Sequence, residues 1–250
     1  MLIVNADDLG RDREASITCL AGFAEGSITS ASVMVFMRDS EGAAGSAQEA
    51  GLETGLHLNL TQPYDGPGVA DSLRRSQQSV VRYLRLGKWA QVVYNPLLNR
   101  DFSVSVQAQL DEYRRLFHGD PAHFNGHNHM HLCMNMLFKP LIPAGSAVRR
   151  SFTFRRGEKG ILNRLYRRGV DAWLEGRYRT TDAFFSVDPT SDLVRLGRIV
   201  DLARKMSVEL MVHAWRPDQF KLLKSNEFRK LITSSSCGTF SMLARRKGGR

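Results

Sequence analysis

The sequence predicts an α/β fold with a parallel β-sheet at its centre. From residue 2 to residue 60, short apolar segments that resemble buried strands alternate with helical segments, which is the pattern of βαβ units. A length of 250 residues is common among barrels assembled from such units. Aspartates and histidines follow several of the predicted strands, where parallel α/β folds place their functional residues.

The first part of the chain alternates regularly between strand and helix. Residues 2–5 are expected to form a buried strand that ends at the polar turn 6–10. A helix over about 12–25 closes at Gly26, because glycine is the usual residue after a helix C-terminus. A strand over 30–36, a helix over 40–50 and a strand over 55–60 follow, and the last strand places His57 and Asn59 on one face.

The regular alternation stops at about residues 61–100. Pro63 and the run 65–68 indicate a loop, and mixed basic and apolar residues follow it. We expect an insertion with one amphipathic helix that covers the site or touches a membrane. Helices are then predicted over 103–117, 135–141, 161–174, 192–205 and 227–232, and strands over 147–148, 207–213 and 239–242.

A histidine-rich stretch is the strongest functional signal. If this stretch is extended, side chains alternate between faces, so one face carries His123, Asn125, His127, His129 and His131. Neutral imidazole is the commonest protein metal ligand, which favours a metal site over a solvated loop. Same-face neighbours on a strand lie about 6.6 Å apart, so only one or two of these histidines are expected to bind one ion.

Candidate ligands and acid–base groups fall at or near the C-terminal ends of the predicted strands. They comprise Asp7 and Asp8, His57, the histidine stretch and His213. Two adjacent carboxylates in a turn should not face the same way, so one would bind a metal while the other works as a base. One carboxylate and two imidazoles leave open positions for water and substrate, which is the pattern of a catalytic metal site.

Composition narrows the cellular context and the partners. No apolar run reaches the length of a bilayer span, and the chain begins with a strand-like run, so we expect a cytoplasmic protein. Three widely spaced cysteines indicate a reduced compartment. The net charge of +10 suits anionic lipid, a phosphorylated substrate or solvated faces, with a basic tail at about 244–250. Nucleic acid is not expected, because no aromatic-interleaved platform or helix-turn-helix pattern is found.

The chain resembles the YdjC-like (ChbG/HpnK) carbohydrate deacetylases. Matching motifs occur in the family's order and cover nearly the whole chain. They are NADDLG at 5–10, TSAS at 29–32, GLHLNLT at 55–61, PAHFNGHNHMH at 121–131, TDAFF at 181–185 and ELMVH at 209–213.

The resemblance implies a fold, an activity and a set of site residues. The fold would be a single-domain (β/α) barrel-like fold over 1–250, a distorted or incomplete TIM-type barrel. The activity would be hydrolysis of the amide C–N bond of an N-acetylated sugar with one divalent metal ion, magnesium or zinc. The implied metal ligands are Asp8, His57 and His127; the base is Asp7 and the acid is His213; the substrate-binding residues are Asn125, His129, Arg149, Arg150 and Asp182.

Two departures from the family pattern keep alternatives open. The family usually has aspartate at the position of Asn125, and an amide tunes neighbouring histidines less than a carboxylate does. It also has proline after the last histidine, where this chain has Ala214 and Trp215. A non-catalytic or altered-specificity relative that binds a sugar or a lipid-carrier substrate is one alternative. The second alternative is another barrel metallohydrolase that acts on a phosphorylated substrate. Many such enzymes have His-x-His after the first strand, and the Asp7-Asp8 pair of this chain argues against that class. The sequence specifies neither the sugar nor the metal, and it is compatible with a homodimer.

Overall fold

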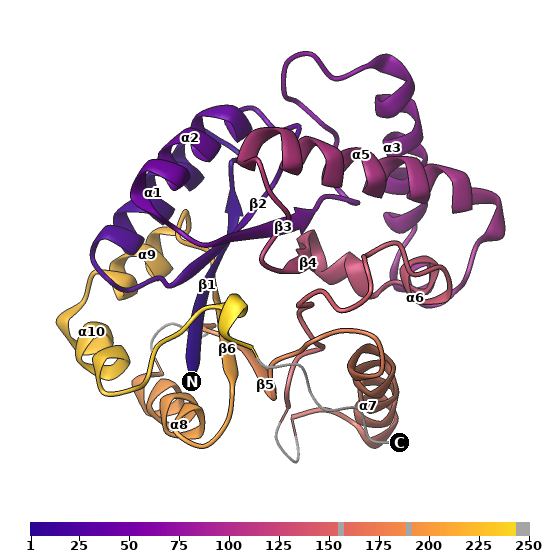
Figure 1. Cartoon of the computed structure of the whole chain (residues 1–250). Coiled ribbons are helices and arrows are strands. Elements are labelled where there is room, and N and C mark those ends of the chain that lie inside the picture. The colour runs from indigo at the N-terminus through magenta and orange to yellow at the C-terminus, as the bar shows by residue number, and fades with distance from the viewer. Residues whose placement is uncertain (155–157, 189–191, 244–250) are drawn as a thin grey trace.

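The computed structural model describes residues 1–154, 158–188 and 192–243, which are built around one parallel sheet (Figure 1). The strands are β1 (Leu2–Leu9), β2 (Ser30–Val33), β3 (Thr54–Leu58), β4 (Phe124–Gly126), β5 (Ala183–Ser186) and β6 (Val208–Val212). Their order in the six-stranded sheet is β4-β3-β2-β1-β6-β5, and all pairs are parallel. The sheet curls into a half-barrel, which confirms the predicted fold class.

Helices surround the curled sheet on its outer side (Figure 1). Local signals fix several of their ends: Asp12 accepts a hydrogen bond from the Ala15 amide at the first helix, and Gly51 ends the second with φ of 68°. The helices are α1 (Arg13–Ala24), α2 (Ser40–Ala50), α3 (Asp71–Leu84), α4 (Lys88–Val92), α5 (Asn99–Phe117), α6 (Met134–Phe138), α7 (Ile161–Glu175), α8 (Leu193–Ala203), α9 (Pro217–Leu223) and α10 (Asn226–Thr233).

Single backbone bridges continue the curl between β4 and β5. Val148 pairs with Phe124 of β4, and Ala147 pairs with Arg179. The amide of Thr153 then donates to the carbonyl of Phe184 on β5. The predicted weak strand at 147–148 is therefore present as two isolated bridges that join the two edges of the sheet.

The inner side of the curl is unusually polar. On β1, Leu2, Val4 and Ala6 pack into the main hydrophobic core on the side of the helices. The alternate residues Asn5 and Asp7 are buried on the other side. Buried polar groups need hydrogen-bond partners, so this interior must contain a connected polar network. That network is the candidate site.

Three local expectations were wrong, and a part of the prediction lies outside the described residues. Residues 61–100 contain two helices, α3 and α4, and the short 3₁₀ helix η1 (Pro96–Leu98), where one helix was expected. The predicted last strand at 239–242 is the 3₁₀ helix η3 (Phe240–Met242). The extended histidine stretch ends after Gly126 and continues as the 3₁₀ helix η2 (His127–Leu132). The expected tail at 244–250 is outside the described ranges.

In the part of the chain that the structure describes, no helix is long and apolar enough to cross a bilayer.

Candidate active site

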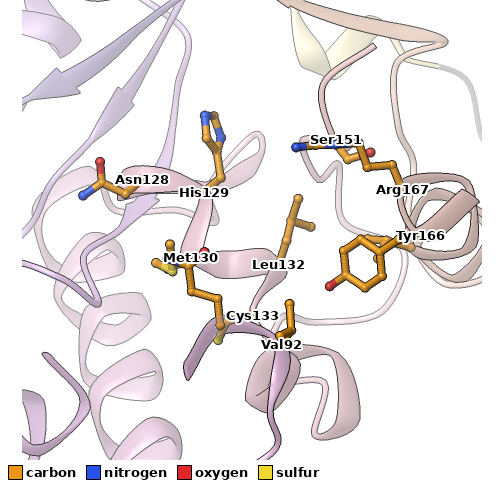
Figure 2. A pocket seen from close by; sticks show the side chains of 11 residues that line it. Val92, Asn128, His129, Met130, Leu132, Cys133, Ser151, Tyr166 and Arg167 are labelled. Carbon is orange, nitrogen blue, oxygen red and sulfur yellow. The ribbon is translucent and has the colours of Figure 1, made fainter. Parts of the chain in front are cut away.

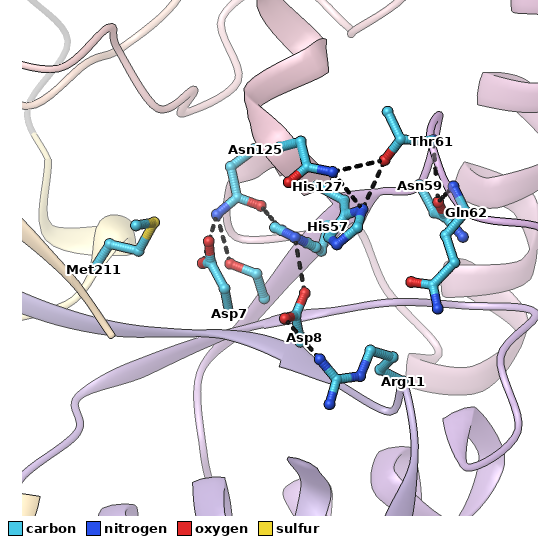
Figure 3. A network of polar contacts seen from close by, with 12 residues as sticks. Asp7, Asp8, Arg11, His57, Asn59, Thr61, Gln62, Asn125, His127 and Met211 are labelled. Carbon is cyan, nitrogen blue, oxygen red and sulfur yellow. Dashed lines mark hydrogen bonds and ion pairs between the residues drawn. The ribbon is translucent and has the colours of Figure 1, made fainter. Parts of the chain in front are cut away.

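Asp7 and Asp8 lie within an irregular end of β1. The register between β1 and β2 shifts between Ala6 and Leu9, and Asp8 has φ of 72°, in the left-handed region that few residues other than glycine adopt. This local turn brings Asp8 against the His57 imidazole, while Asp7 turns toward Asn125 (Figure 3). Asp8 Oδ1 is 3.2 Å from His57 Nε2, and Asp7 is linked to His57 Nδ1 through the amide of Asn125. The two adjacent carboxylates thus have different partners, as expected: Asp8 faces His57, whereas Asp7 faces Arg149 and Asn125.

Two of the three predicted metal ligands meet directly, and the third is close. Burial alone would lower the pKa of His57, but the charges of Asp7 and Asp8 outweigh it and raise that pKa above its ordinary value. The His127 ring centroid is 5.9 Å from that of His57, and Thr61 Oγ1 is 2.7 Å from His127 Nδ1 (Figure 3). The nitrogen of His127 that is not bound to Thr61 is the one left for a ligand.

The Asp8–His57 pair fits one side of a divalent metal site. Asp8 Oδ1 is buried without a hydrogen-bond partner, and its 3.2 Å separation from His57 Nε2 is close to the spacing of about 3.3 Å between two ligands of one tetrahedral zinc ion. Across residues 1–154, 158–188 and 192–243, no three carboxylate, imidazole or thiol groups converge into a complete metal site. A third ligand from His127 would require its ring to turn toward the pair.

Arg149 holds the opposite side of the cluster together. Its side chain is fully buried, and its Nη1 and Nη2 donate to the two oxygens of Asp7 at 2.6 and 2.7 Å. Its Nε donates to Glu209 Oε1 at 2.7 Å. Burial alone would raise the pKa of Asp7, but the Arg149 guanidinium holds it well below its usual range. Burial raises the pKa of Glu209 to about 7 although Arg149 lowers it, and the nearby charge of Asp7 adds to the rise.

The sequence reasoning did not single out Glu209, although a signal was present. Glu209 is the second residue of the buried strand β6, between Val208 and Leu210. A carboxylate inside an apolar strand needs a buried cationic partner. That requirement alone would have paired Glu209 with one of the arginines.

The amide of Asn125 connects the two halves of the cluster in either of two orientations. In one, Oδ1 lies 2.7 Å from His57 Nδ1, while Nδ2 donates to Ser32 Oγ at 2.7 Å and to Asp7 Oδ1 at 3.3 Å. In the other, Nδ2 donates to His57 Nδ1, and Oδ1 accepts from Arg149 at 2.9 Å. The orientation decides which His57 nitrogen carries the proton, and only the first leaves Nε2 free to bind a metal.

Trp215 and Arg11 complete the environment of Asp8, and both were missed. Trp215 Nε1 donates to Asp8 Oδ2 at 2.9 Å, and Arg11 Nη1 lies 3.3 Å from the same oxygen. The Arg11 guanidinium also stacks over the Trp215 ring at 4.1 Å. Trp215 follows the half-buried His213, whose charge contributes to the low pKa of both Asp7 and Asp8. The Trp215 indole therefore fixes the second oxygen of Asp8 and leaves Oδ1 facing His57.

The remaining histidines of the stretch do not share one face. Asn128 and His129 have left-handed backbone angles, so the chain turns after His127. The His123 ring stacks on Phe240 with centroids 3.8 Å apart. His131 Nε2 lies 3.0 Å from the Arg149 carbonyl. Asn125 and His127 of the stretch lie next to His57, and His123 reaches Asn125 only through Ser32. The single row of side chains is therefore absent, and one histidine of the stretch lies near His57, within the expected one or two.

Of the predicted substrate-binding residues, two lie away from the cluster. Arg150 donates to Asp171 Oδ2 at 2.9 Å, on α7. Asp182 accepts from Ser207 at 2.6 and 2.9 Å, beside the N-terminal ends of β5 and β6, at the opposite edge of the sheet. Asp182, which the resemblance implied as a substrate-binding residue, therefore lies at the other end of the strands from His57.

His129 faces a cavity beside the cluster. Its ring packs edge-on against Phe152, with centroids 4.6 Å apart. Figure 2 shows Asn128 and His129 on one side of this cavity and Tyr166 and Arg167 of α7 on the other. The cavity has a volume of about 140 Å³. The cavity therefore offers space for part of a ligand next to His129, two residues after His127.

The buried histidines predict that stability falls in acid. Burial lowers the pKa of His123 and His129 well below the ordinary value, of His127 to about 4 and of His131 to about 3. The unfolded chain therefore binds more protons than the folded one between about pH 4 and 6.5, so the free energy of unfolding should decrease as the pH falls through that range. The raised pKa values of His57 and Glu209 oppose this trend, but the four buried histidines outnumber these two groups.

Urea unfolding between pH 5 and 6, with chelator present, measures this slope. His131→Gln should make the slope shallower by at most about 1.4 kcal/mol per pH unit, the value for one proton. His118→Asn, at an exposed histidine with left-handed φ, is the matched control and should leave the slope unchanged. An equal slope in wild type and His131→Gln would contradict the expectation.

The parallel sheet forms a curled half-barrel, and its strand ends carry a cluster of carboxylates, an imidazole and a guanidinium. This is the architecture of an α/β barrel protein with an enzyme-like site. The chain belongs to the YdjC-like protein family, whose sequence profile matches residues 1–234. This confirms the resemblance seen in the motifs.

Named relatives and a solved structure are similar to this chain. It is 27% identical over 225 residues to a chitooligosaccharide deacetylase of Escherichia fergusonii, covering 85% of this chain and 81% of the relative. It is 27% identical over 179 residues to a carbohydrate deacetylase of Mus musculus, covering 71% of this chain but only 55% of the relative. A crystal structure of an Enterococcus faecalis V583 protein, proposed to cleave cellobiose phosphate, aligns over 97% of this chain and 98% of that one, with a TM-score of 0.67 and 17% identity. This last similarity supports the fold alone.

Proposed function

We propose that this protein is a carbohydrate N-deacetylase, a metal-dependent hydrolase that cleaves the amide C–N bond of an N-acetylated sugar. The observation that carries the proposal is the contact of Asp8 Oδ1 with His57 Nε2 beside the buried Asp7–Arg149 ion pair. The family membership and the names of the two deacetylase relatives support it. The substrate would be an oligosaccharide, a glycolipid or a nucleotide-linked sugar.

The proposed ligand set is Asp8 and His57, with His127 as the third member. A bound divalent ion would activate water and polarise the acetyl carbonyl. Trp215 and Arg11 hold Asp8 Oδ2, so Oδ1 is the oxygen available to the ion. Asn125 would hold His57 in the tautomer whose Nε2 is free.

Asp7 is the proposed base, and its ion pair has two opposite effects. Arg149 keeps the carboxylate ionised and fixed, which a proton acceptor needs. The same guanidinium lowers the proton affinity of Asp7, which slows the transfer. Water would lose its proton to Asp7 as it attacks the acetyl carbon, and His213 would protonate the departing amine. Acetate and a free amino sugar would result.

A second candidate is a relative that binds a sugar or a lipid carrier without hydrolysing it, or with altered specificity. The observation that favours it is the second orientation of Asn125, in which His57 Nε2 carries the proton and points at Asp8. An aspartate at this position would not donate to His57 in that way. In that orientation His57 is not a ligand, and the site would retain its shape without the metal.

Acetate release over a panel of N-acetylated sugars distinguishes the two candidates. We expect wild-type activity to be lost on chelation and restored by zinc or magnesium. Asp8→Ala should bind less metal and release no acetate while remaining folded, because it removes the unpartnered buried oxygen that faces His57. Asp201→Ala, at a carboxylate 66% exposed on α8, is the matched control and should behave as wild type. Sugar binding without acetate release at any metal concentration would exclude the deacetylase.

A further inference from the structure

Large apolar side chains are exposed on three helices that line two adjoining hollows. On α7, Ile161 and Leu162 are 74% and 83% exposed, and Leu165 is also exposed. Trp89 on α4 is 81% exposed, and Phe138 at the end of α6 is 68% exposed. Single exposed apolar residues are normal, but a cluster of large ones indicates an interaction surface. We call this set of residues the α4–α6–α7 face.

Two hollows join the three helices into one continuous surface. A groove of about 550 Å³ runs between α6 and α7 and is lined by Leu137, Phe138, Leu165 and Trp173. The cavity next to His129 is lined by Val92 of α4 and by Tyr166 of α7 (Figure 2). The apolar face therefore continues from α6 across α7 to α4 and extends to the edge of the candidate site.

The charge around this face has a single dominant sign. Arg85, just before α4, and Lys88, at its start, are exposed, and residues 72–100 contain no aspartate or glutamate. On α7, Arg164, Arg167 and Arg168 alternate with the exposed apolar residues. The two acidic residues of the same helix, Asp171 and Glu175, both pair with Arg150. The basic side chains thus border the apolar surface.

We propose that the α4–α6–α7 face docks onto the surface of an anionic lipid bilayer. Tryptophan and leucine beside arginines on one face are the combination that binds at the headgroup level, where apolar side chains insert and arginines contact lipid phosphates. This contact goes beyond the proposed deacetylation and does not depend on it. A second copy of the chain is a poorer occupant, because a symmetric contact would bring the arginines of both α7 helices together.

Vesicle co-sedimentation of the full-length protein tests the docking. The protein should sediment with phosphatidylcholine vesicles that contain phosphatidylglycerol, and much less with phosphatidylcholine alone. The double variant Trp89→Glu, Leu162→Glu should lower the bound fraction at least about tenfold, since it removes two apolar contacts and adds two repelled charges. Ile17→Glu, at a residue 56% exposed on α1, adds charge far from α7 and should bind as wild type (Figure 1).

A second variant tests the electrostatic part separately. Arg164→Gln with Arg168→Gln should weaken binding to the anionic vesicles about fivefold for each arginine. Three outcomes would overturn the docking. The first is equal sedimentation of wild type with both kinds of vesicle, and the second is an unchanged bound fraction in the Trp89 and Leu162 double variant. The third is a wild-type protein that does not bind vesicles but forms a dimer in gel filtration, which the double variant dissociates.

Discussion

Asp7→Asn is expected to lower kcat for acetate release by about 10²–10⁴-fold, the range for removing one proton-transfer group. The asparagine amide would retain a hydrogen bond from Arg149 but would not accept a proton from water. Metal content should stay near the wild-type value, because Asp7 faces Arg149 and Asn125 and does not contact His57 directly. Single-turnover acetate release and metal analysis on the same samples measure both quantities.

The control for this variant is Asp182→Asn, the same chemical change at the opposite edge of the sheet. It should leave kcat within about twofold of wild type, because Asp182 is remote from the proposed proton transfer. Near-normal turnover in Asp7→Asn would remove Asp7 from the mechanism. A parallel loss of metal in Asp7→Asn would instead show that Asp7 acts on the ligands.

Arg149→Met is expected to destabilise the protein by about 3–5 kcal/mol at pH 7, the cost of breaking a buried ion pair. Arg149 is fully buried between Asp7 and Glu209, so the change leaves two buried carboxylates without their cation. Arg38→Met is the control, because Arg38 is 74% exposed in its pair with Asp65 and such surface pairs contribute about 1 kcal/mol or less.

The pH dependence of the Arg149→Met effect separates lost charge pairing from lost packing. Without the guanidinium, burial would raise the pKa of both Asp7 and Glu209 above their unfolded values, and ionising them would then cost stability. The deficit relative to wild type should therefore be largest near neutral pH and shrink as the pH falls and the carboxylates protonate. Urea unfolding of both proteins across this range measures the difference. A deficit that does not change with pH would point to packing.

Much of the fold was predictable because its signals are local. Strand segments such as 30–36 and 207–213 and helices such as 103–117 follow from periodicity and from terminal glycines, and the structure contains an element at each. The bend after Gly126 was not predictable from alternation. Asn128 and His129 adopt left-handed angles there, which a pattern of side-chain types does not encode.

The candidate site was predictable only where its residues lie at strand ends. Asp8, His57 and Asn125 meet because three parallel strands end at one edge of the sheet. The partnership of Arg149 with Glu209, and that of Trp215 with Asp8, depend on side chains far apart in the chain. No periodicity specifies such pairs, although the burial of Glu209 in an apolar strand does demand a cation.

The position of β1 in the sheet has a consequence for synthesis of the chain. β1 is translated before the other five strands of the sheet, yet one of its two neighbours is β6, with Leu2 paired to Val208 and Ala6 to Val212. One edge of the central strand therefore stays unpaired in the nascent chain until β6 has left the ribosome. Such distant pairing slows folding and leaves an open strand edge on which other chains can aggregate. Asp8 also lacks its Trp215 partner until then. The site is thus among the last parts of the protein to form.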